Sequence, residues 1–168
     1  LHYPLRRQRQ MCIRDRIYIE WMASVIKKAE LPYRDVAGKK DFEDFLSNKI
    51  EQGYYPVMSA ILVPMYENAH RVRDRATATL DLAQIGLLLK AYRAEQGGYP
   101  ESLEQLAEYM GVELPQDPFS GQPYVYRRDG DGFMVYSIGP NLEDDGGALR
   151  PQGVAETEAG DIVFRYAS

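Results

Sequence analysis

An acidic, glycine-rich stretch near the C-terminus carries the residues best suited to bind a ligand. Glu143, Asp144 and Asp145 are consecutive acids, and Gly146 and Gly147 follow them. Closely spaced carboxylates supply the oxygen ligands that a hard cation such as calcium prefers, and glycines allow the backbone to wrap tightly. The same carboxylates could serve in acid–base catalysis, but the sequence does not fix their geometry, and many acidic loops are simply solvated. A cation-binding loop is therefore one hypothesis for this stretch.

The other chemically capable residues favour no catalytic site. His70 lies on the charged side of a predicted helix, and Asp74 stands where a zinc-protease helix carries its second histidine. The sequence has no nucleophile elbow and no phosphate-binding glycine loop, and its single cysteine excludes an internal disulfide. The run from Asp129 to Gly132 is similar to the start of an EF-hand loop, but it lacks the later ligands and fits a hairpin turn. We therefore predict that the protein is not an enzyme.

Charge is distributed unevenly along the chain. The 168 residues have a net charge of −5, but residues 1–100 carry 16 Lys and Arg against 12 Asp and Glu, and residues 101–168 carry 4 against 13. An acidic C-terminal half disfavours nucleic acid as a partner, because phosphate binding needs a basic surface. The longest apolar run, residues 56–65, is shorter than the roughly 20 residues of a membrane helix. Any membrane contact is therefore expected only through sequence upstream of this chain.

The N-terminal third reads as a tail followed by short helices. Residues 1–16 lack helical or strand periodicity, and the run from Met11 to Arg16 resembles the translated read-through of a sequencing adapter. A natural disordered tail is the alternative. Residues 17–31 and 41–52 have the apolar spacing of two short helices, with a loop over residues 33–40 between them. We predict a non-native tail at residues 1–16, a helical fragment of an upstream region at residues 17–56, and a domain at residues 57–168.

One long amphipathic helix is predicted from Pro64 to Gly97, roughly 30 residues in length. Its main apolar stripe recurs every three or four residues: Met65, Ala69, Val72, Ala76, Leu80, Ala83, Leu87 and Ala91. Further apolar residues widen that stripe toward the C-terminal end: Leu82, Ile85, Leu89 and Tyr92. A wide stripe favours a helix that faces a sheet, so Leu82, Ile85 and Leu89 are expected there; a coiled coil is the alternative.

The C-terminal part of the chain predicts a small sheet. A short helix is expected from Glu101 to Leu106 with Ser102 or the residue before it as its cap, and breaker residues then predict a loop over residues 111–122. Residues 123–128 and 133–138 alternate as strands around a hairpin turn, and residues 161–166 form a last strand. The fold class is therefore α+β: a long spine helix packed on an antiparallel sheet of about three strands, preceded by short helices.

Several ordered motifs between residues 57 and 166 resemble the globular domain of the type II secretion pseudopilins, especially the major pseudopilin. They are Val63-Pro64, Ala91-Tyr92-Arg93, Gly98-Tyr99-Pro100, Asp117-Pro118-Phe119-Ser120-Gly121-Gln122-Pro123-Tyr124-Val125-Tyr126, Phe133-Met134-Val135-Tyr136-Ser137-Ile138-Gly139 and Asp161-Ile162. The prepilin cleavage site of that family has no counterpart before Val63, where two soluble-looking helices precede instead. The resemblance is thus to a pseudopilin globular domain at the C-terminus of a larger protein.

This resemblance implies a noncatalytic structural or interaction module of the bacterial cell envelope, with protein partners that include further copies of the chain. It implies the periplasm, or the outer face of the inner membrane, as the location, and membrane anchorage in the full-length protein. In the major pseudopilin the acidic loop binds calcium; the matching ligands here are Asn141, Leu142 through its carbonyl, Asp144, Asp145 and Asp161. The alternative function is a calcium- or ligand-binding accessory domain at the C-terminus of a larger exported protein or enzyme.

Overall fold

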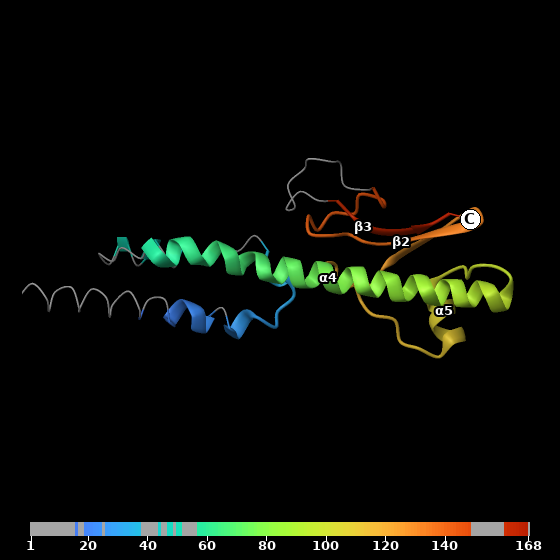
Figure 1. Ribbon diagram of the computed structural model, residues 1–168, viewed down its shortest axis with the longest axis horizontal. Helices are drawn as coiled ribbons and strands as arrows, with labels where there is room; N and C mark the ends of the chain where they lie inside the picture. Colours follow the sequence, from blue (N-terminus) through green and yellow to red (C-terminus); the bar gives the residue numbers. More distant parts are fainter. Residues whose placement is uncertain are drawn as a thin grey trace, which may run out of the picture. The chain divides into compact units, whose positions relative to one another are not determined.

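The computed structural model describes residues 16, 19–24, 26–37, 44, 47–48, 50–51, 57–148 and 160–167, with backbone only for residues 57–68 (Figure 1). The chain divides into two compact units. The first comprises Leu1–Leu31 and Asp35–His70, and the second comprises Pro32–Arg34 and Arg71–Ser168. The predicted tail lies outside the described residues except for Arg16. Among the described residues, no helix is long and apolar enough to span a membrane.

The first unit contains helical segments on both sides of the predicted loop. Residues 19–24 and 26–28 are helical, as expected, and a turn follows them. Trp21 is buried within this unit, whereas Ile19 and Ile26 are 64% and 67% exposed. The described residues of the second predicted helix (44, 47–48 and 50–51) are helical, and the rest of that prediction lies outside the described part of the chain. The imidazole Nδ1 of His70 lies 3.1 Å from the carbonyl oxygen of Leu31.

The expected loop over residues 33–40 is wrong at its start, because Tyr33–Val36 forms a single helical turn, α2. The backbone N–H of Tyr33 donates to the carboxylate of Asp74, 2.6 Å away and 41 positions later in the chain. The first N–H groups of a helix need an acceptor, which a nearby Asp or Ser usually supplies. Here the acceptor comes from another helix, so local sequence could not reveal the turn.

Helix α4 spans Val57–Gln96 and is longer than predicted, since it begins upstream of Pro64. It ends where expected, at Gly97, which adopts a left-handed backbone conformation with φ of 76°. Leu82, Ile85 and Leu89 are at most 2% exposed and belong to the main core cluster, as predicted. The other predicted stripe is not part of this face: Val72, Leu80 and Leu87 are 57%, 65% and 68% exposed. The sequence pattern therefore merged two stripes that lie on opposite faces of one helix.

The sheet has the predicted three antiparallel strands: β1 (Val125–Asp129), β2 (Gly132–Ser137) and β3 (Ile162–Tyr166), in the order β1-β2-β3. Every residue of β2, the central strand, is buried. β1 and β2 form the expected hairpin, with Asp129 paired to Gly132 across the turn. β2 and β3 pair from Phe133 opposite Tyr166 to Ser137 opposite Ile162. The fold class is α+β, as the sequence predicted.

Helix α5 (Leu103–Met110) begins at the predicted cap, where the Ser102 hydroxyl accepts a hydrogen bond from the backbone N–H of Gln105. Its Leu106 is fully buried in the same core cluster as α4 and the sheet. Close approach of β3 to α4 depends on Gly86, because a β-carbon there would lie 2.5 Å from the ring of Phe164. The core of the second unit is thus formed by the inner face of α4 together with side chains of α5 and the sheet.

Candidate functional site

The acidic loop leaves β2 and returns to β3 through two glycines that lie close together. Gly139 has φ of 71°, and a β-carbon on it would meet the carbonyl oxygen of Gly160 at 2.6 Å. Leu142, inside the loop, also has a positive φ, of 61°, which is uncommon for a residue other than glycine. The described part of the loop, residues 139–148, is therefore tightly folded at its base.

Asp161 organises this loop from the start of β3. Its carboxylate is 5% exposed, and it accepts hydrogen bonds from the backbone N–H groups of Asp145 at 3.3 Å and Gly147 at 2.6 Å. Burial raises the pKa of Asp161, and the negative charges of Asp145 and Asp144 raise it further, while the two N–H bonds act in the opposite direction. The net effect is a raised pKa, and its main cause is the burial of the carboxyl group, with the neighbouring acids as a smaller contribution.

The neighbouring acids are also held in place. Asp144 accepts hydrogen bonds from the hydroxyl of Tyr136 at 3.0 Å and from the backbone N–H of Gly146 at 2.9 Å. The amide of Asn141 donates to Asp145 at 2.8 Å. The structure therefore links Asn141, Asp145 and Asp161 through hydrogen bonds and ties Asp144 to the sheet.

The donor chemistry of this loop fits calcium, since every candidate ligand is an oxygen and three of them are carboxylates. The position of Asp144 and Asp145 beside the buried Asp161 favours a cation, because a bound positive charge would offset the repulsion among these carboxylates. In this structure both carboxylate oxygens of Asp161 accept hydrogen bonds from backbone N–H groups. In the part of the chain that the structure describes, no group of three His, Cys, Asp or Glu side chains has its ligand atoms gathered for a metal.

Asp117 is a second buried acid, for which the sequence predicted only a turn. It is 1% exposed and accepts hydrogen bonds from the backbone N–H groups of Phe119 and Ile138 and from the hydroxyl of Ser137. Ser137 in turn accepts from the backbone N–H of Gly139, where the acidic loop begins. Asp117 thus fixes the end of β2, and its oxygens are used for structure.

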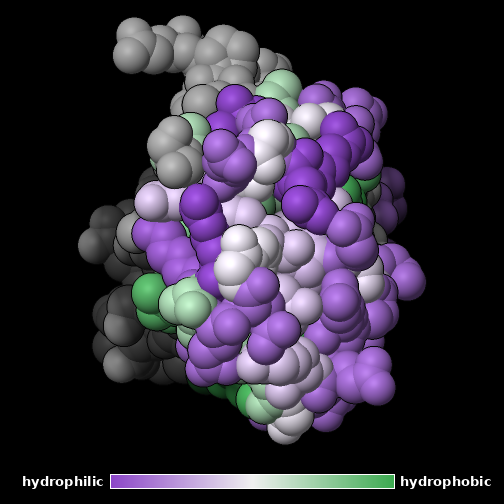
Figure 2. All heavy atoms as spheres, turned by 90° about the vertical axis from the view of Figure 1, so that its right-hand side faces the viewer, coloured by the Kyte–Doolittle hydropathy of each residue, from purple (hydrophilic) through white to green (hydrophobic). Residues whose placement is uncertain are grey.

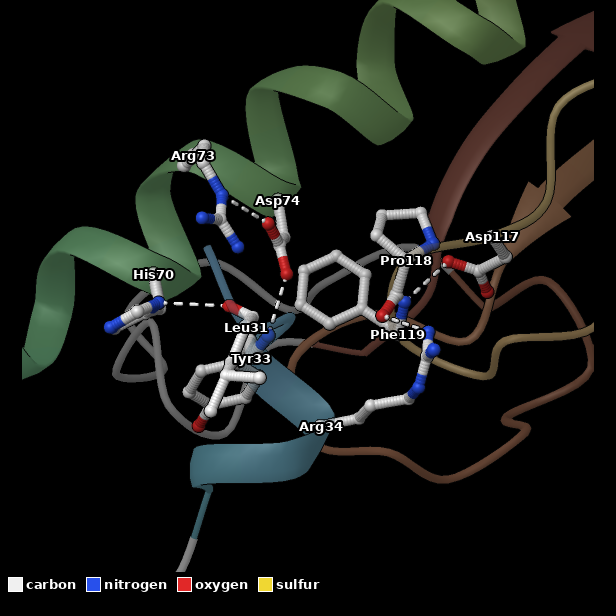
Figure 3. A network of polar contacts seen from close by, with 9 residues as sticks. All are labelled: Leu31, Tyr33, Arg34, His70, Arg73, Asp74, Asp117, Pro118 and Phe119. Carbon is white, nitrogen blue, oxygen red and sulfur yellow. Dashed lines mark hydrogen bonds and ion pairs between the residues drawn. The ribbon is translucent and has the colours of Figure 1, made fainter. Parts of the chain in front are cut away.

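The segment Pro32–Arg34 docks on the second unit through three kinds of contact, shown in Figure 3. The Tyr33 N–H donates to Asp74, which is 3% exposed, and Asp74 also accepts from the Arg73 guanidinium at 2.7 Å. The ring of Tyr33 lies edge-on to Phe119, with centroids 5.9 Å apart. Arg34 donates to the carbonyl oxygen of Pro118 at 3.0 Å. This segment is therefore part of the folded domain, which the sequence did not predict.

The outer face of α4 is the most apolar exposed feature of the second unit. Beside the three large exposed residues Val72, Leu80 and Leu87, the face carries the exposed Ala76 and Ala91 and the half-buried Ala83. By contrast, the end of the molecule seen in Figure 2 is covered mostly by hydrophilic side chains. Large apolar residues gathered on one exposed face mark a protein-binding surface more often than scattered ones do.

Comparison of this chain with protein-family models, with curated proteins and with solved structures gave no match. The function is therefore inferred from the geometry of the second unit and from the motifs of its sequence.

Proposed function

We propose that this protein is a noncatalytic structural and interaction module of the bacterial cell envelope, similar to the pseudopilins of type II secretion. The observation that carries the proposal is that α4 is apolar on two opposite faces. The inner face, with Ile85 and Leu89 fully buried, holds the domain together, and the outer face, with Leu80 and Leu87 exposed, has no part in its core. A helix that is apolar on both sides needs a second partner to bury the other side.

The role of the polar clusters agrees with a structural function. The carboxylates of Asp117, Asp161 and Asp74 are the three buried acids among the described residues, and each accepts at least one backbone N–H. Groups engaged in this way order turns and helix starts. The proposal accordingly assigns no catalytic step to them, and it places the module's chemistry in protein–protein contacts.

Location and partners follow from the same proposal. The module acts in the periplasm or at the outer face of the inner membrane, and its partners are envelope proteins, including copies of itself. The surplus of 13 acidic over 4 basic residues in positions 101–168 makes nucleic acid an unsuitable partner.

A chimera tests the proposal. Residues 64–168 replace the matching part of a type II secretion major pseudopilin, behind that protein's own membrane helix, in a bacterium that assembles pseudopili. We expect the chimera to appear in the sheared pseudopilus fraction, detected by immunoblotting. A chimera that is stable and membrane-inserted but absent from that fraction would contradict the proposal.

The second candidate function is a calcium-binding accessory domain of a larger exported protein. It is favoured by one specific observation: the buried Asp161 accepts the backbone N–H of Asp145 and lies near enough to the carboxylates of Asp144 and Asp145 to be repelled by both. Asn141, the Leu142 carbonyl and these three acids would hold the ion, which would supply positive charge to a loop with little apolar surface. The two functions are compatible, because the loop and the outer face of α4 share no residues.

A further inference from the structure

The outer face of α4 has a regular repeat within the second unit. Six of its apolar residues follow one another at steps of four, four, three, four and four: Val72, Ala76, Leu80, Ala83, Leu87 and Ala91. Val72, Ala76 and Leu80 therefore each have a counterpart eleven residues later. An 11-residue repeat corresponds to about 3.67 residues per turn, close to a straight α-helix, so such a stripe runs nearly along the helix axis. A straight stripe of this kind suits contact with another long helix.

These six residues alternate between large and small side chains, beginning with a large one and ending with a small one. In an antiparallel copy the order is therefore small to large, so each large position meets a small one. A two-fold axis between Asp81 and Leu82 pairs the stripe with an antiparallel copy of itself. The pairs are Val72 with Ala91, Ala76 with Leu87, and Leu80 with Ala83. Every large side chain then faces an alanine, which is the arrangement that lets two packed surfaces interdigitate. A parallel pair in register would instead place large against large and small against small.

We propose that the outer face of α4 binds a second copy of this chain as an antiparallel, two-fold symmetric helix pair. Charge supports this occupant. Arg73 and Glu95 lie on the same side of the stripe near its two ends, so the antiparallel arrangement brings Arg73 of each copy toward Glu95 of the other. In a parallel pair in register, Arg73 of one copy and Glu95 of the other would instead be about 33 Å apart along the helices. On the other side of the stripe, Lys90 contacts its own chain, because its ammonium group lies 4.0 Å from the centre of the Tyr166 ring in β3.

This inference rests on the proposed function in one respect, namely that the outer face is a protein-binding surface. It adds the partner and the orientation. A two-fold pair uses the same patch on both copies and leaves none of it for a third. The pair and any larger assembly built through this face therefore exclude each other, and self-association would compete with assembly.

Cysteine cross-linking of the purified full chain tests the orientation. In a Cys12→Ser background, a single cysteine is placed at Ala83, beside the axis, or at Val72, near the end of the stripe. At a rise of about 1.5 Å per residue, Ala83 and its symmetry mate are separated by about 4.5 Å along the helices, and Val72 and its mate by about 28 Å. A short bismaleimide should therefore join two A83C chains and leave V72C chains single. Mixing V72C with A91C chains should restore a cross-linked dimer.

Two results would overturn the inference. Cross-linking of V72C chains as efficiently as A83C chains would show a parallel pair, and no cross-linked dimer in any sample would show that copies do not pair here. Unchanged thermal midpoints of the three variants ensure that misfolding is not the cause. If cross-linking fails while the chimera still enters the pseudopilus fraction, the second copy is the wrong partner and the proposed function stands. If cross-linking succeeds and the chimera is excluded, the proposed function fails and the pair stands.

Discussion

The two faces of α4 in the second unit have the same kind of residues and opposite environments. Leu89 on the inner face is fully buried against the sheet and α5, whereas Leu87, two positions earlier, is 68% exposed. Composition therefore does not distinguish a core stripe from a binding stripe. The environment is decided by what the rest of the chain brings to each face, and Gly86, which admits the Phe164 ring, marks where the sheet approaches.

The largest expected effect separates these faces by stability. Leu89→Ala should lower the free energy of unfolding by about 2–5 kcal/mol, because it removes a packed side chain and leaves a cavity. The matched variant Leu87→Ala should change it by less than about 0.5 kcal/mol at protein concentrations too low for two copies to pair, since no core contact is lost. Denaturant unfolding of both variants measures the difference. Equal losses would mean that both faces are buried in the isolated chain.

Calcium should stabilise the acidic loop between β2 and β3 and should leave the outer face of α4 unaffected. If it binds the acidic loop of the folded chain, a hundredfold excess over the dissociation constant adds about 2.7 kcal/mol of stability. The thermal midpoint should then rise with calcium and fall with EDTA, while cross-linking through the outer face stays the same. Magnesium should do less, because it demands octahedral geometry and retains its water.

Asp161→Asn provides the control for that experiment, since it removes the charge and keeps one acceptor oxygen at the same place. The calcium-minus-EDTA difference should disappear in this variant, whatever its own stability. Identical melting curves of the unmodified chain with calcium and with EDTA would show that calcium does not bind the loop, which its own hydrogen bonds then hold.

A smaller effect is expected at the border between the two faces. Gly86→Ala places a methyl group 2.5 Å from the Phe164 ring, and such overpacking costs about 1–3 kcal/mol. Alanine gains up to about 1 kcal/mol over glycine in helix propensity, so a net loss of about 1 kcal/mol is expected. The variant Ala83→Gly, three residues earlier, measures separately how much the alanine–glycine difference in helix propensity changes the free energy of unfolding. A Gly86→Ala chain that is more stable than the original would show that β3 does not approach α4 so closely.

Sequence alone predicted the elements whose signals are local. The Ser102 cap, the hairpin turn before Gly132 and the stop at Gly97 each depend on residues within one turn of the chain. It also placed Leu82, Ile85 and Leu89 in the core, because they share one helical face.

What sequence missed depends on distant contacts. The helical turn at Tyr33 forms because Asp74 accepts its N–H, and the role of Asp117 depends on Ser137 in another strand. Periodicity alone also could not tell the inner from the outer stripe of α4, because both recur at three to four residues and only tertiary structure covers one of them. The proposed calcium ligands could be named from sequence, but not the hydrogen bonds that engage Asp161.

A Leu80→Glu, Leu87→Glu double variant of the chimera tests most directly whether the outer face of α4 binds a protein partner. The measurement is its incorporation into the pseudopilus fraction. Charges on the outer face should leave the thermal midpoint of the domain nearly unchanged and abolish incorporation. The control variant Val112→Glu, Gln122→Glu adds the same charge at positions exposed elsewhere in the second unit and should be incorporated normally. Normal incorporation of the Leu80→Glu, Leu87→Glu chain would show that the outer face of α4 binds no partner, and would contradict the account.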